Sequence, residues 1–442
     1  MIEVPEYVSA AIERLNANGF EAFAVGGCVR DLVLKNTPHD WDITTSAEPD
    51  EIKEVFEDFK TFDVGKRYGT VSVIIDSVTL EITTYRSEGN YQSHRKPQNV
   101  SFVKSLEQDL KRRDFTMNAL CICDGEIIDM FGGINDINNK TIRAIGNPDE
   151  RFAEDALRIL RALRFSSALG FGIEKETKRS IYKNRWLLRY ISRERIRDEL
   201  LKLLCGKNVK SVLLEYKEII AVALPEIRRM FYVPQNTPHH KYDVYTHTVQ
   251  SVENIKPDPT LRLTMLLHDI GKPQVLRTDE RGVTHFKTHP ERSVAVAREV
   301  LKTLKLPKEQ SEYILSLIKE HDNRVEKSKD RMVELLLRHG YDKRFFEDYL
   351  SVRFADTLAQ SEYLRDKKIE GLNALGERAR SFLSSNKAVK ITELKINGSD
   401  LLSLGFSGKQ IGDAQNRLAK AVAFGEITNT REELISFAKS NK

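Results

Sequence analysis

The stretch His39-Asp40-Trp41-Asp42 decides how the rest of the sequence is interpreted. On a β-strand, Asp40 and Asp42 would present their carboxylates on one face and Trp41 its ring on the other, because side chains alternate. Two close carboxylates disfavour each other's charged form unless a cation lies between them, and Mg²⁺ is commonly held by one or two carboxylates together with phosphates. The stretch therefore predicts metal-assisted phosphoryl chemistry, although Asp-x-Asp also occurs in ordinary surface turns.

An expected phosphate-binding turn precedes this acidic pair. Residues 20–25 form an apolar run of strand length, Gly26 and Gly27 follow directly, and a helix is expected to begin near Val29. Glycines allow the backbone to approach a ligand closely, and a helix N-terminus favours an anion. Arg30 adds a positive charge beside the turn. A Gly-Gly pair can occur in any tight turn. Phosphate binding is favoured here because the pair precedes Asp40 and Asp42 by only one short helix.

A β-hairpin is expected after the acidic pair. Its strands cover residues 71–75 and 79–85, and Asp76-Ser77 forms the turn. Alternation in the second strand places Glu81 on the polar face, which makes it a candidate third carboxylate. The polar residues 86–99 are expected to form a mobile loop.

Cations gather in two later segments. Lys111-Arg112-Arg113-Asp114 concentrates them beside one acid, and Asn118 follows shortly afterwards. Ion pairs on a helix surface would account for some of these charges, whereas the triphosphate of a nucleotide would account for all of them. Residues 143–210 are also rich in arginine and lysine, which indicates either a solvated helical face or a polyanionic partner.

Asp155, Arg158 and Arg161 lie at intervals of three within an expected helix over residues 152–169. Asp155 and Arg158 would then be neighbours on one surface of the helix. An aspartate accepts hydrogen bonds and an arginine donates them, which matches the edges of cytosine and adenine and leaves uracil and guanine mismatched. The alternative is an ordinary salt bridge between two turns of the helix.

Composition bounds the class of protein. The 442 residues predict about three domains, and contents of 40% hydrophobic and 31% charged residues are typical of a globular protein. No apolar run approaches the roughly 18 residues of a membrane span, and no secretory signal is evident, so we expect a cytoplasmic protein without a membrane partner. The four cysteines form no C-x-x-C pair and are expected to be reduced.

Five motifs occur in the order seen in bacterial class II CCA-adding tRNA nucleotidyltransferases and their poly(A) polymerase relatives, which this sequence resembles. The motifs are Gly26-Gly27-Cys28-Val29-Arg30-Asp31, Asp40-Trp41-Asp42, Arg112-Arg113-Asp114-Phe115-Thr116-Met117-Asn118-Ala119, Glu154-Asp155-x-x-Arg158-x-x-Arg161 and Arg193-Glu194-Arg195-Ile196. They cover about the first half of the chain, and residues 396–434 resemble the tRNA-contacting tail of the same family. The resemblance implies an α+β protein, with a small mixed sheet in a β-polymerase-like nucleotidyltransferase head and helical segments after it.

The resemblance also implies a domain order and an activity. It divides the chain into a head at 1–146, a helical neck and body at 147–224 for base reading and RNA binding, an HD domain at 240–330, and a helical, tRNA-binding tail at 331–442. The implied activity is template-independent addition of CCA to tRNA from CTP and ATP with Mg²⁺ as cofactor. The alternatives are a poly(A) polymerase, a CC- or A-adding enzyme, and an HD-type phosphohydrolase with a reduced transferase role.

Carried over by position, the resemblance assigns Asp40 and Asp42 to the Mg²⁺ ions, with Glu81 as a weaker candidate for a third ligand. One departure is Ser93, which stands in the loop where many relatives have an aspartate and leaves the choice between full and partial CCA addition open. The residues implied to bind the nucleotide are Gly26, Gly27, Arg30, Arg112, Arg113, Asp114, Asn118, Asp155, Arg158, Arg161 and Arg164.

A second set of histidines and aspartates resembles the HD phosphohydrolase domain that some CCA-adding enzymes carry. Side chains of these types from several helices can hold a divalent transition metal and leave room for water or phosphate, or they can form a purely structural site. The sequence does not indicate the oligomeric state. The candidate metal ligands are His247, His268, Asp269, His321 and Asp322, with His285 and His289 as further candidates.

Overall fold

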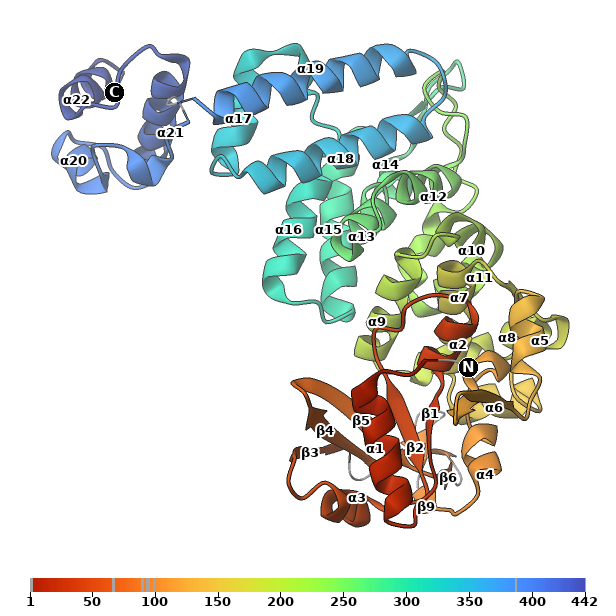
Figure 1. The fold of residues 1–442 in the computed structure, drawn as a ribbon. Helices are drawn as coiled ribbons and strands as arrows, with labels where there is room; N and C mark the ends of the chain where they lie inside the picture. The colour runs from red at the N-terminus through yellow and green to blue at the C-terminus, as the bar shows by residue number, and fades with distance from the viewer. Residues whose placement is uncertain are drawn as a thin grey trace. The chain divides into compact units, whose positions relative to one another are not determined.

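The computed structural model describes residues 3–65, 68–88, 91–92, 96–97, 100–385 and 388–441 (Figure 1). The chain divides into two compact units, residues 1–225 and 226–442. A mixed sheet with helices forms the first unit and helices dominate the second, so the predicted α+β class is confirmed. Ser93, the position at which the sequence departs from many relatives, lies outside the described residues. The four-part domain order remains a prediction.

A seven-stranded sheet forms the centre of the first unit, in the order β11-β10-β1-β2-β5-β4-β3. β2 runs antiparallel to β1 and parallel to β5. The predicted hairpin is confirmed: β4 and β5 pair antiparallel, and its turn residues Asp76 and Ser77 have φ of 49° and 66°. The strands are β1 (Ala22–Val25), β2 (Asp42–Thr45), β3 (Lys60–Gly65), β4 (Thr70–Ile75), β5 (Val78–Thr84), β10 (Leu120–Cys123) and β11 (Glu126–Asp129).

Alternation along β5 buries Leu80 and Ile82 and leaves Glu81 exposed, as the period-two pattern predicts. The strand predicted around Asp40 is shorter than expected, because β2 begins only at Asp42. Trp41 is nevertheless buried, so the indole anchors the segment that leads into β2. Short strands add local pairs: β6 (Arg86–Glu88) with β9 (Val100–Phe102), β7 (Tyr91–Gln92) with β8 (Lys96–Pro97), and β12 (Thr141–Ile142) with β13 (Gly172–Ile173).

The helix predicted over residues 152–169 is two helices. Asp155 has an extended backbone, with φ −129° and ψ 102°, and it separates α6 from α7. The helices of the first unit are α1 (Glu6–Ala17), α2 (Gly27–Val33), α3 (Pro49–Val55), α4 (Leu106–Lys111), α5 (Gly133–Asn138), α6 (Pro148–Glu154), α7 (Leu157–Leu169), α8 (Lys175–Asn184), α9 (Arg193–Leu204), α10 (Val209–Glu215) and α11 (Lys217–Ala223).

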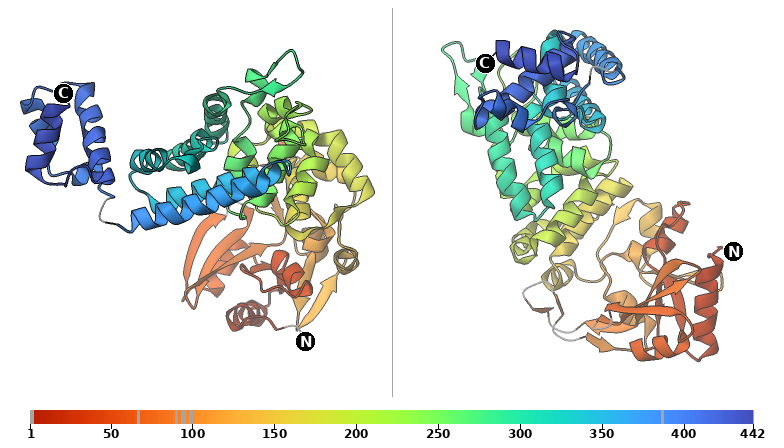
Figure 2. Two further views of the ribbon diagram at one scale, coloured as in Figure 1. Left: turned by 90° about the horizontal axis from the view of Figure 1, so that it is seen from above. Right: turned by 90° about the vertical axis from the view of Figure 1, so that its left-hand side faces the viewer.

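Over its described residues, the second unit is built from helices and a small strand pair between β14 (Arg277–Thr278) and β15 (Thr284–His285). The long helices α18 and α19 lie side by side, as the views in Figure 2 show. The helices are α12 (Val244–Asn254), α13 (Pro259–Leu267), α14 (Lys272–Val275), α15 (His289–Thr303), α16 (Lys308–Glu320), α17 (Lys329–Arg338), α18 (Lys343–Ala359), α19 (Arg365–Leu383), α20 (Gly398–Ser403), α21 (Lys409–Phe424) and α22 (Arg431–Ser440).

The structure bears on two expectations from composition, which concern membrane-spanning helices and disulfide bonds. Within the described ranges, no helix combines the length and apolar character that crossing a membrane requires. All four cysteines are free thiols, as their spacing predicts.

Candidate functional site

A cavity of about 650 Å³ in the first unit brings together the residues implied to bind the nucleotide. All eleven of them line it, together with Asp42, whereas Asp40 and Glu81 are not among its lining residues. Eight arginines and three aspartates face this space, so it favours an anionic ligand. Its lining residues are Gly26, Gly27, Arg30, Asp42, Tyr68, Arg86, Arg112, Arg113, Asp114, Asn118, Asp155, Leu157, Arg158, Arg161, Arg164, Phe165 and Arg195.

The turn between β1 and α2 requires glycine at its first position. Gly26 has φ 88° and ψ −126°, a conformation that residues with a Cβ atom rarely adopt. A Cβ atom at this position would lie 3.0 Å from Nη1 of Arg113. On α2, Arg30 donates a hydrogen bond from Nη1 to Oδ1 of Asn118 at 2.7 Å. Backbone and guanidinium groups therefore meet at this edge of the cavity.

Gly26→Ala is expected to weaken CTP and ATP binding about tenfold, because the methyl group displaces Arg113 and the positive φ costs about 1–2 kcal/mol. Isothermal titration with each nucleotide measures the effect. Gly19→Ala is the matched control, since Gly19 has φ +84° but no atom within 4 Å of an added Cβ. Equal weakening in both variants would show that backbone strain alone is responsible and that the contact with Arg113 is irrelevant.

Asp42 lies where three acidic side chains approach one another. Its Cα pairs with that of Glu81 in the parallel register of β2 and β5. Burial raises the pKa of Asp42, and the negative charges of Glu81 and Asp40 raise it further. The positive charge of Arg113 lowers this pKa, but the net shift is upward. A divalent cation would relieve this repulsion, so the acids fit a Mg²⁺ site. Among the described residues, their oxygens do not form a group with all members within 4.8 Å of one another.

Asp109 is a buried residue of this site that the sequence analysis missed. Its Oδ1 accepts hydrogen bonds from Arg112, at 2.9 Å from Nε and 2.7 Å from Nη2, and from the backbone N–H of Arg86 at 3.3 Å. Its Oδ2 accepts from Oγ1 of Thr44 at 3.1 Å and from Nη2 of Arg113 at 3.4 Å. One carboxylate therefore positions two cavity arginines and joins them to β2.

Asp114, which is buried, forms an ion pair with the half-buried Arg161 at the cavity. Nε of Arg161 donates to Oδ2 of Asp114 at 2.7 Å, and Nδ2 of Asn118 donates to Oδ1 at 2.9 Å. Burial raises the pKa of Asp114, but Arg161 and the hydrogen bond from Asn118 lower it more, so the carboxylate stays charged. Glu199 on α9, also missed in the sequence, lies 3.7 Å from Nη1 of Arg161 and 3.4 Å from Nε of Arg164.

The predicted placement of Asp155 and Arg158 on one helix is wrong, because the chain breaks between α6 and α7. Asp155 instead caps α7, where Oδ1 accepts from the N–H of Leu157 at 3.0 Å, and it pairs with Nη2 of Arg195 at 2.7 Å. Arg158 pairs with Oε2 of Glu154 at 2.7 Å. Both residues nevertheless line the cavity. They reach it from the break between the two helices and from α7, and not from neighbouring turns of one helix.

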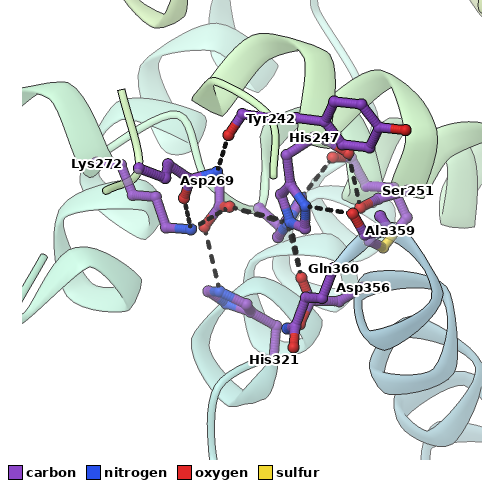
Figure 3. Close-up of polar contacts among 12 residues, drawn as sticks. Tyr242, His247, Ser251, Asp269, Lys272, His321, Asp356, Ala359 and Gln360 are labelled. Atoms are coloured by element: carbon purple, nitrogen blue, oxygen red, sulfur yellow. Dashed lines mark hydrogen bonds and ion pairs between the residues drawn. The ribbon is translucent and has the colours of Figure 1, made fainter. Parts of the chain in front are cut away.

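Six buried or half-buried side chains meet in the second unit, and we call them the histidine–aspartate cluster. Figure 3 labels four of them, His247, Asp269, His321 and Asp356. The six side chains form two groups whose ligand atoms lie within 4.8 Å of one another: His247, His268 and Asp356, and Asp269, His289 and His321.

Asp269 lies between the two groups. Its Oδ2 is 3.2 Å from Nε2 of His268, and its Oδ1 is 3.4 Å from Nε2 of His289 and 3.6 Å from Nε2 of His321. Oδ1 of Asp356 lies 2.9 Å from Nε2 of His247 and 3.7 Å from that of His268. Asp269 therefore presents one carboxylate oxygen toward each of the two groups.

The histidine rings are oriented for coordination. In three of them Nδ1 approaches a backbone carbonyl: His268 lies 2.6 Å from Met265 O, His289 2.9 Å from Phe286 O, and His321 2.6 Å from Ile318 O. A proton on Nδ1 leaves Nε2 available as a ligand atom, and Nε2 of His289 lies 3.0 Å from Nε2 of His321, so one of these two atoms carries a proton that a metal would displace. Nε2 of His268 and both oxygens of Asp269 are buried without a hydrogen-bond partner among the described residues, although Lys272 forms an ion pair with Asp269 at 2.7 Å. These groups fit a metal centre.

Two of the predicted ligands lie elsewhere. Asp322 follows His321 at the end of α16, is exposed, and lies 3.7 Å from Nε of Arg324. His285 is exposed and interacts with Asp279 at 2.8 Å through Nε2. Asp356 from α18 occupies the position that the sequence analysis gave to Asp322. No local motif marks Asp356, because it reaches the cluster only through the packing of α18 against α12.

Family models match three segments of the chain. Residues 22–143 match a model described as the Poly A polymerase head domain. Residues 170–230 match one for an RNA and SrmB binding site of polymerase A, and residues 275–438 match tRNA nucleotidyltransferase domain 2.

Curated relatives and solved structures extend this similarity over the whole chain. The chain is 36% identical to a CCA-adding enzyme of Ligilactobacillus salivarius, over 97% of this chain and 94% of that one. It is 35% identical to a CCA-adding enzyme of Enterococcus faecalis, over 99% and 97% of the two chains. A crystal structure of the Bacillus stearothermophilus CCA-adding enzyme in complex with CTP superposes with a TM-score of 0.73 at 29% identity, covering 99% of this chain and 97% of that chain.

Proposed function

The chain belongs to the CCA-adding enzyme family, and on this premise we propose that it adds CCA to the 3′ ends of tRNA from CTP and ATP without a nucleic-acid template. The observation that carries the proposal is the cavity of the first unit, in which arginines for a triphosphate lie beside Asp42. The chemistry is nucleotidyl transfer: the 3′-hydroxyl of the tRNA forms a bond to the α-phosphorus of the nucleotide, and pyrophosphate leaves.

The acidic side chains have the role of metal ligands in this proposal. Asp40 and Asp42 hold Mg²⁺, with Glu81 as a weaker third ligand. Bound there, Mg²⁺ lowers the pKa of the attacking hydroxyl and neutralises charge on the pyrophosphate. The repulsion among these three carboxylates supports the assignment, since it disappears when a cation lies between them.

The arginine-rich wall binds and orients the nucleotide. Gly26, Gly27 and Arg30 receive the triphosphate, and Asp109 holds Arg112 and Arg113 in position for the same group. Guanidinium groups suit this task because they donate paired hydrogen bonds to phosphate oxygens. Asp114 and Asn118 contact the ribose and phosphates.

The base is read by acceptors and donors of the α6–α7 region. A carboxylate accepts from the amino group of cytosine or adenine, and a guanidinium donates to the ring nitrogen beside it. Uracil and guanine present the opposite order and leave buried groups unpaired. The residues in this role are Asp155, Arg158, Arg161 and Arg164, which Arg195 and Glu199 hold in place.

A tRNA that ends at the nucleotide before CCA tests the proposal. We expect CTP alone to extend it by two nucleotides, CTP with ATP by three, and ATP alone by none, as resolved by product length on a sequencing gel. A ladder of many adenylates on an arbitrary RNA would identify a poly(A) polymerase instead. Extension by two nucleotides even with both substrates would identify a CC-adding enzyme, and extension of a tRNA ending in CC alone an A-adding one.

We further propose that the histidine–aspartate cluster is an HD-type site for divalent transition metals. The buried Nε2 of His268 and the buried oxygens of Asp269, which have no hydrogen-bond partner among the described residues, support this assignment, and Lys272 forms an ion pair with the same carboxylate. Imidazole and carboxylate together suit transition metals, which bind water or phosphate at remaining positions. In this proposal the second unit carries a hydrolytic centre in the same chain as the nucleotidyltransferase.

A further inference from the structure

One aromatic ring lies among the arginines that line the cavity of the first unit. Phe165 on α7 is 5% exposed and belongs to the cavity wall. The guanidinium carbon of Arg164 lies 4.2 Å from the centroid of this ring, that of Arg30 5.2 Å and that of Arg161 5.4 Å. A guanidinium group within about 6 Å of an aromatic centroid is attracted by the ring. Three cations of the cavity therefore share one aromatic ring.

The three arginines come from two helices with different roles in the proposed function. Arg30 lies on α2, which begins at the glycine turn assigned to the triphosphate. Arg161 and Arg164 lie on α7 and are assigned to the base. Phe165 follows Arg161 by four residues, so these two side chains are neighbours on one surface of α7, whereas Arg30 reaches the ring from a distant part of the chain. The ring therefore joins the triphosphate side of the cavity to the base-reading side.

Polar contacts connect the same three arginines around the ring. Nη1 of Arg30 donates to Oδ1 of Asn118 at 2.7 Å, and Nδ2 of Asn118 donates to Oδ1 of Asp114 at 2.9 Å. Oδ2 of Asp114 accepts in turn from Nε of Arg161 at 2.7 Å. Glu199 lies 3.7 Å from Arg161 and 3.4 Å from the third arginine of the set. Groups that share such a network are energetically coupled, so a shift of one guanidinium is transmitted to the others.

The arrangement holds like charges close together. Burial lowers the pKa of Arg164, and the charges of Arg161 and Arg30 lower it further, against the effect of Glu199. The faces of an aromatic ring carry partial negative charge, so the Phe165 ring offsets part of this repulsion. An aliphatic side chain of similar size would fill the same volume without attracting the arginines.

A second aromatic ring fixes the orientation of the first. Phe115 is fully buried and contacts Phe165 in a T-shaped pair, with 5.9 Å between centroids and 86° between planes. Aromatic pairs of this geometry attract each other beyond the effect of their buried area. Phe115 also follows Asp114, the residue that accepts from Arg161. Phe165 therefore offers the arginines a surface whose position is set by packing.

We propose that Phe165 is a positioning residue that couples base reading to alignment of the triphosphate. The inference rests on the nucleotidyl transfer proposed above. A matching base leaves Arg161 and Arg164 on the ring, and Arg30 then stays in place for the triphosphate. A mismatched base displaces the two guanidinium groups of α7, the ring and the polar network pass the displacement to Arg30, and the α-phosphate lies away from the attacking hydroxyl. Discrimination between bases therefore affects kcat as well as KM.

Stepwise fluorination of the Phe165 ring, in the full chain, tests this coupling. Each fluorine withdraws charge from the faces of the ring and changes its size little, so the attraction for guanidinium groups weakens in steps. With mono-, di- and trifluorinated phenylalanine at position 165, we expect kcat/KM for CTP to fall progressively, by about tenfold at the end of the series. UTP already disturbs the network and should lose little, so the preference for CTP over UTP should fall by about fivefold, mostly in kcat. Phe165→Leu, which has no aromatic faces, should reduce the preference further.

Phe56 provides the matched control for fluorination. It is fully buried, forms a T-shaped pair with Phe59 at 5.9 Å between centroids, and has the guanidinium carbon of Arg14 5.5 Å from its own centroid. It is not among the lining residues of the cavity. The same fluorinated residues at position 56 weaken an aromatic–guanidinium contact of the same kind, so they should lower Tm slightly while kcat, KM and the preference for CTP over UTP keep their wild-type values.

The outcomes separate this inference from the proposed function. Wild-type kinetics throughout the series at position 165, or equal losses for CTP and UTP, would overturn the coupling and leave CCA addition standing. A wild type that incorporates neither CTP nor ATP into tRNA would overturn the proposed function instead. Titration calorimetry then decides the coupling: fluorination that weakens CTP binding more than UTP binding supports it, and equal weakening of both contradicts it.

Discussion

Asp42→Asn is expected to reduce CTP incorporation into tRNA by about a thousandfold or more, since a bound metal supplies several kcal/mol of transition-state stabilisation and each 1.36 kcal/mol is about tenfold in rate. The substitution keeps the shape of the side chain at the start of β2 and removes the charge that holds the cation. Nucleotide affinity should change far less, because the arginines of the cavity remain. Single-turnover extension with labelled CTP, together with equilibrium CTP binding, separates the two effects.

Asp63→Asn provides the matched control. Asp63 lies on β3 at the edge of the same sheet and pairs with Lys53 at 3.0 Å in an exposed position. Exposed pairs of this kind contribute about 0–1 kcal/mol, so extension should proceed at the wild-type rate. If Asp42→Asn extends tRNA as fast as this control, Asp42 is not a metal ligand and the proposed mechanism fails at its first step.

Asp109→Asn is expected to have the largest effect on stability. The substitution removes the charge of a fully buried carboxylate from the half-buried guanidinium groups of Arg112 and Arg113, and breaking a buried pair costs about 3–5 kcal/mol. For a unit of this size each kcal/mol corresponds to about 2–4 °C in Tm, so thermal unfolding of the first unit should shift by about 10 °C. Asp58→Asn, which removes an exposed pair with Arg14, should shift it by little.

The pH dependence of this effect follows from the pKa of Asp109. Burial raises that pKa, but Arg112 and Arg113 lower it more, and the net shift is downward. A carboxyl group whose pKa is lowered in the folded state stabilises the protein above its unfolded pKa of about 3.9, and the stabilisation disappears as the pH falls through the folded pKa. The difference in Tm between wild type and Asp109→Asn should therefore be constant near pH 7 and diminish below about pH 4. A difference that stayed constant to low pH would mean that the charge of Asp109 is not responsible.

Activity gives a second measure of Asp109. Arg112 and Arg113 line the cavity proposed to bind the nucleotide, and Asp109 fixes their guanidinium groups. In the folded variant, assayed well below its Tm, the KM for CTP and ATP should rise several-fold more than kcat falls. A change in stability alone would leave both constants unaltered at that temperature.

Local chemistry made much of the first site predictable. The Gly26-Gly27 turn, the hairpin with Asp76 and Ser77, and the burial pattern around Glu81 depend on residues close together in the chain, so period and turn propensity were sufficient. The sequence analysis missed Asp109 and Glu199, although the sequence pattern around each of them indicates a buried acid. Both are acids placed three residues after an apolar residue on an amphipathic helix, and both are buried, where a charge requires a partner.

Motifs in the sequence and the family resemblance that they carry predicted the fold class, six of the eight arginines that line the cavity of the first unit, and the four histidines of the histidine–aspartate cluster, because residue type and local spacing carry that information. Tertiary structure alone decided that Asp155 caps α7 and pairs with Arg195, since the break after Glu154 depends on how two helices pack. Only the tertiary structure shows that Asp356, and not the predicted Asp322, belongs to the histidine–aspartate cluster. The physical reason is the same in both cases: helical periodicity tells which side of a helix is buried, but not which distant helix that side meets.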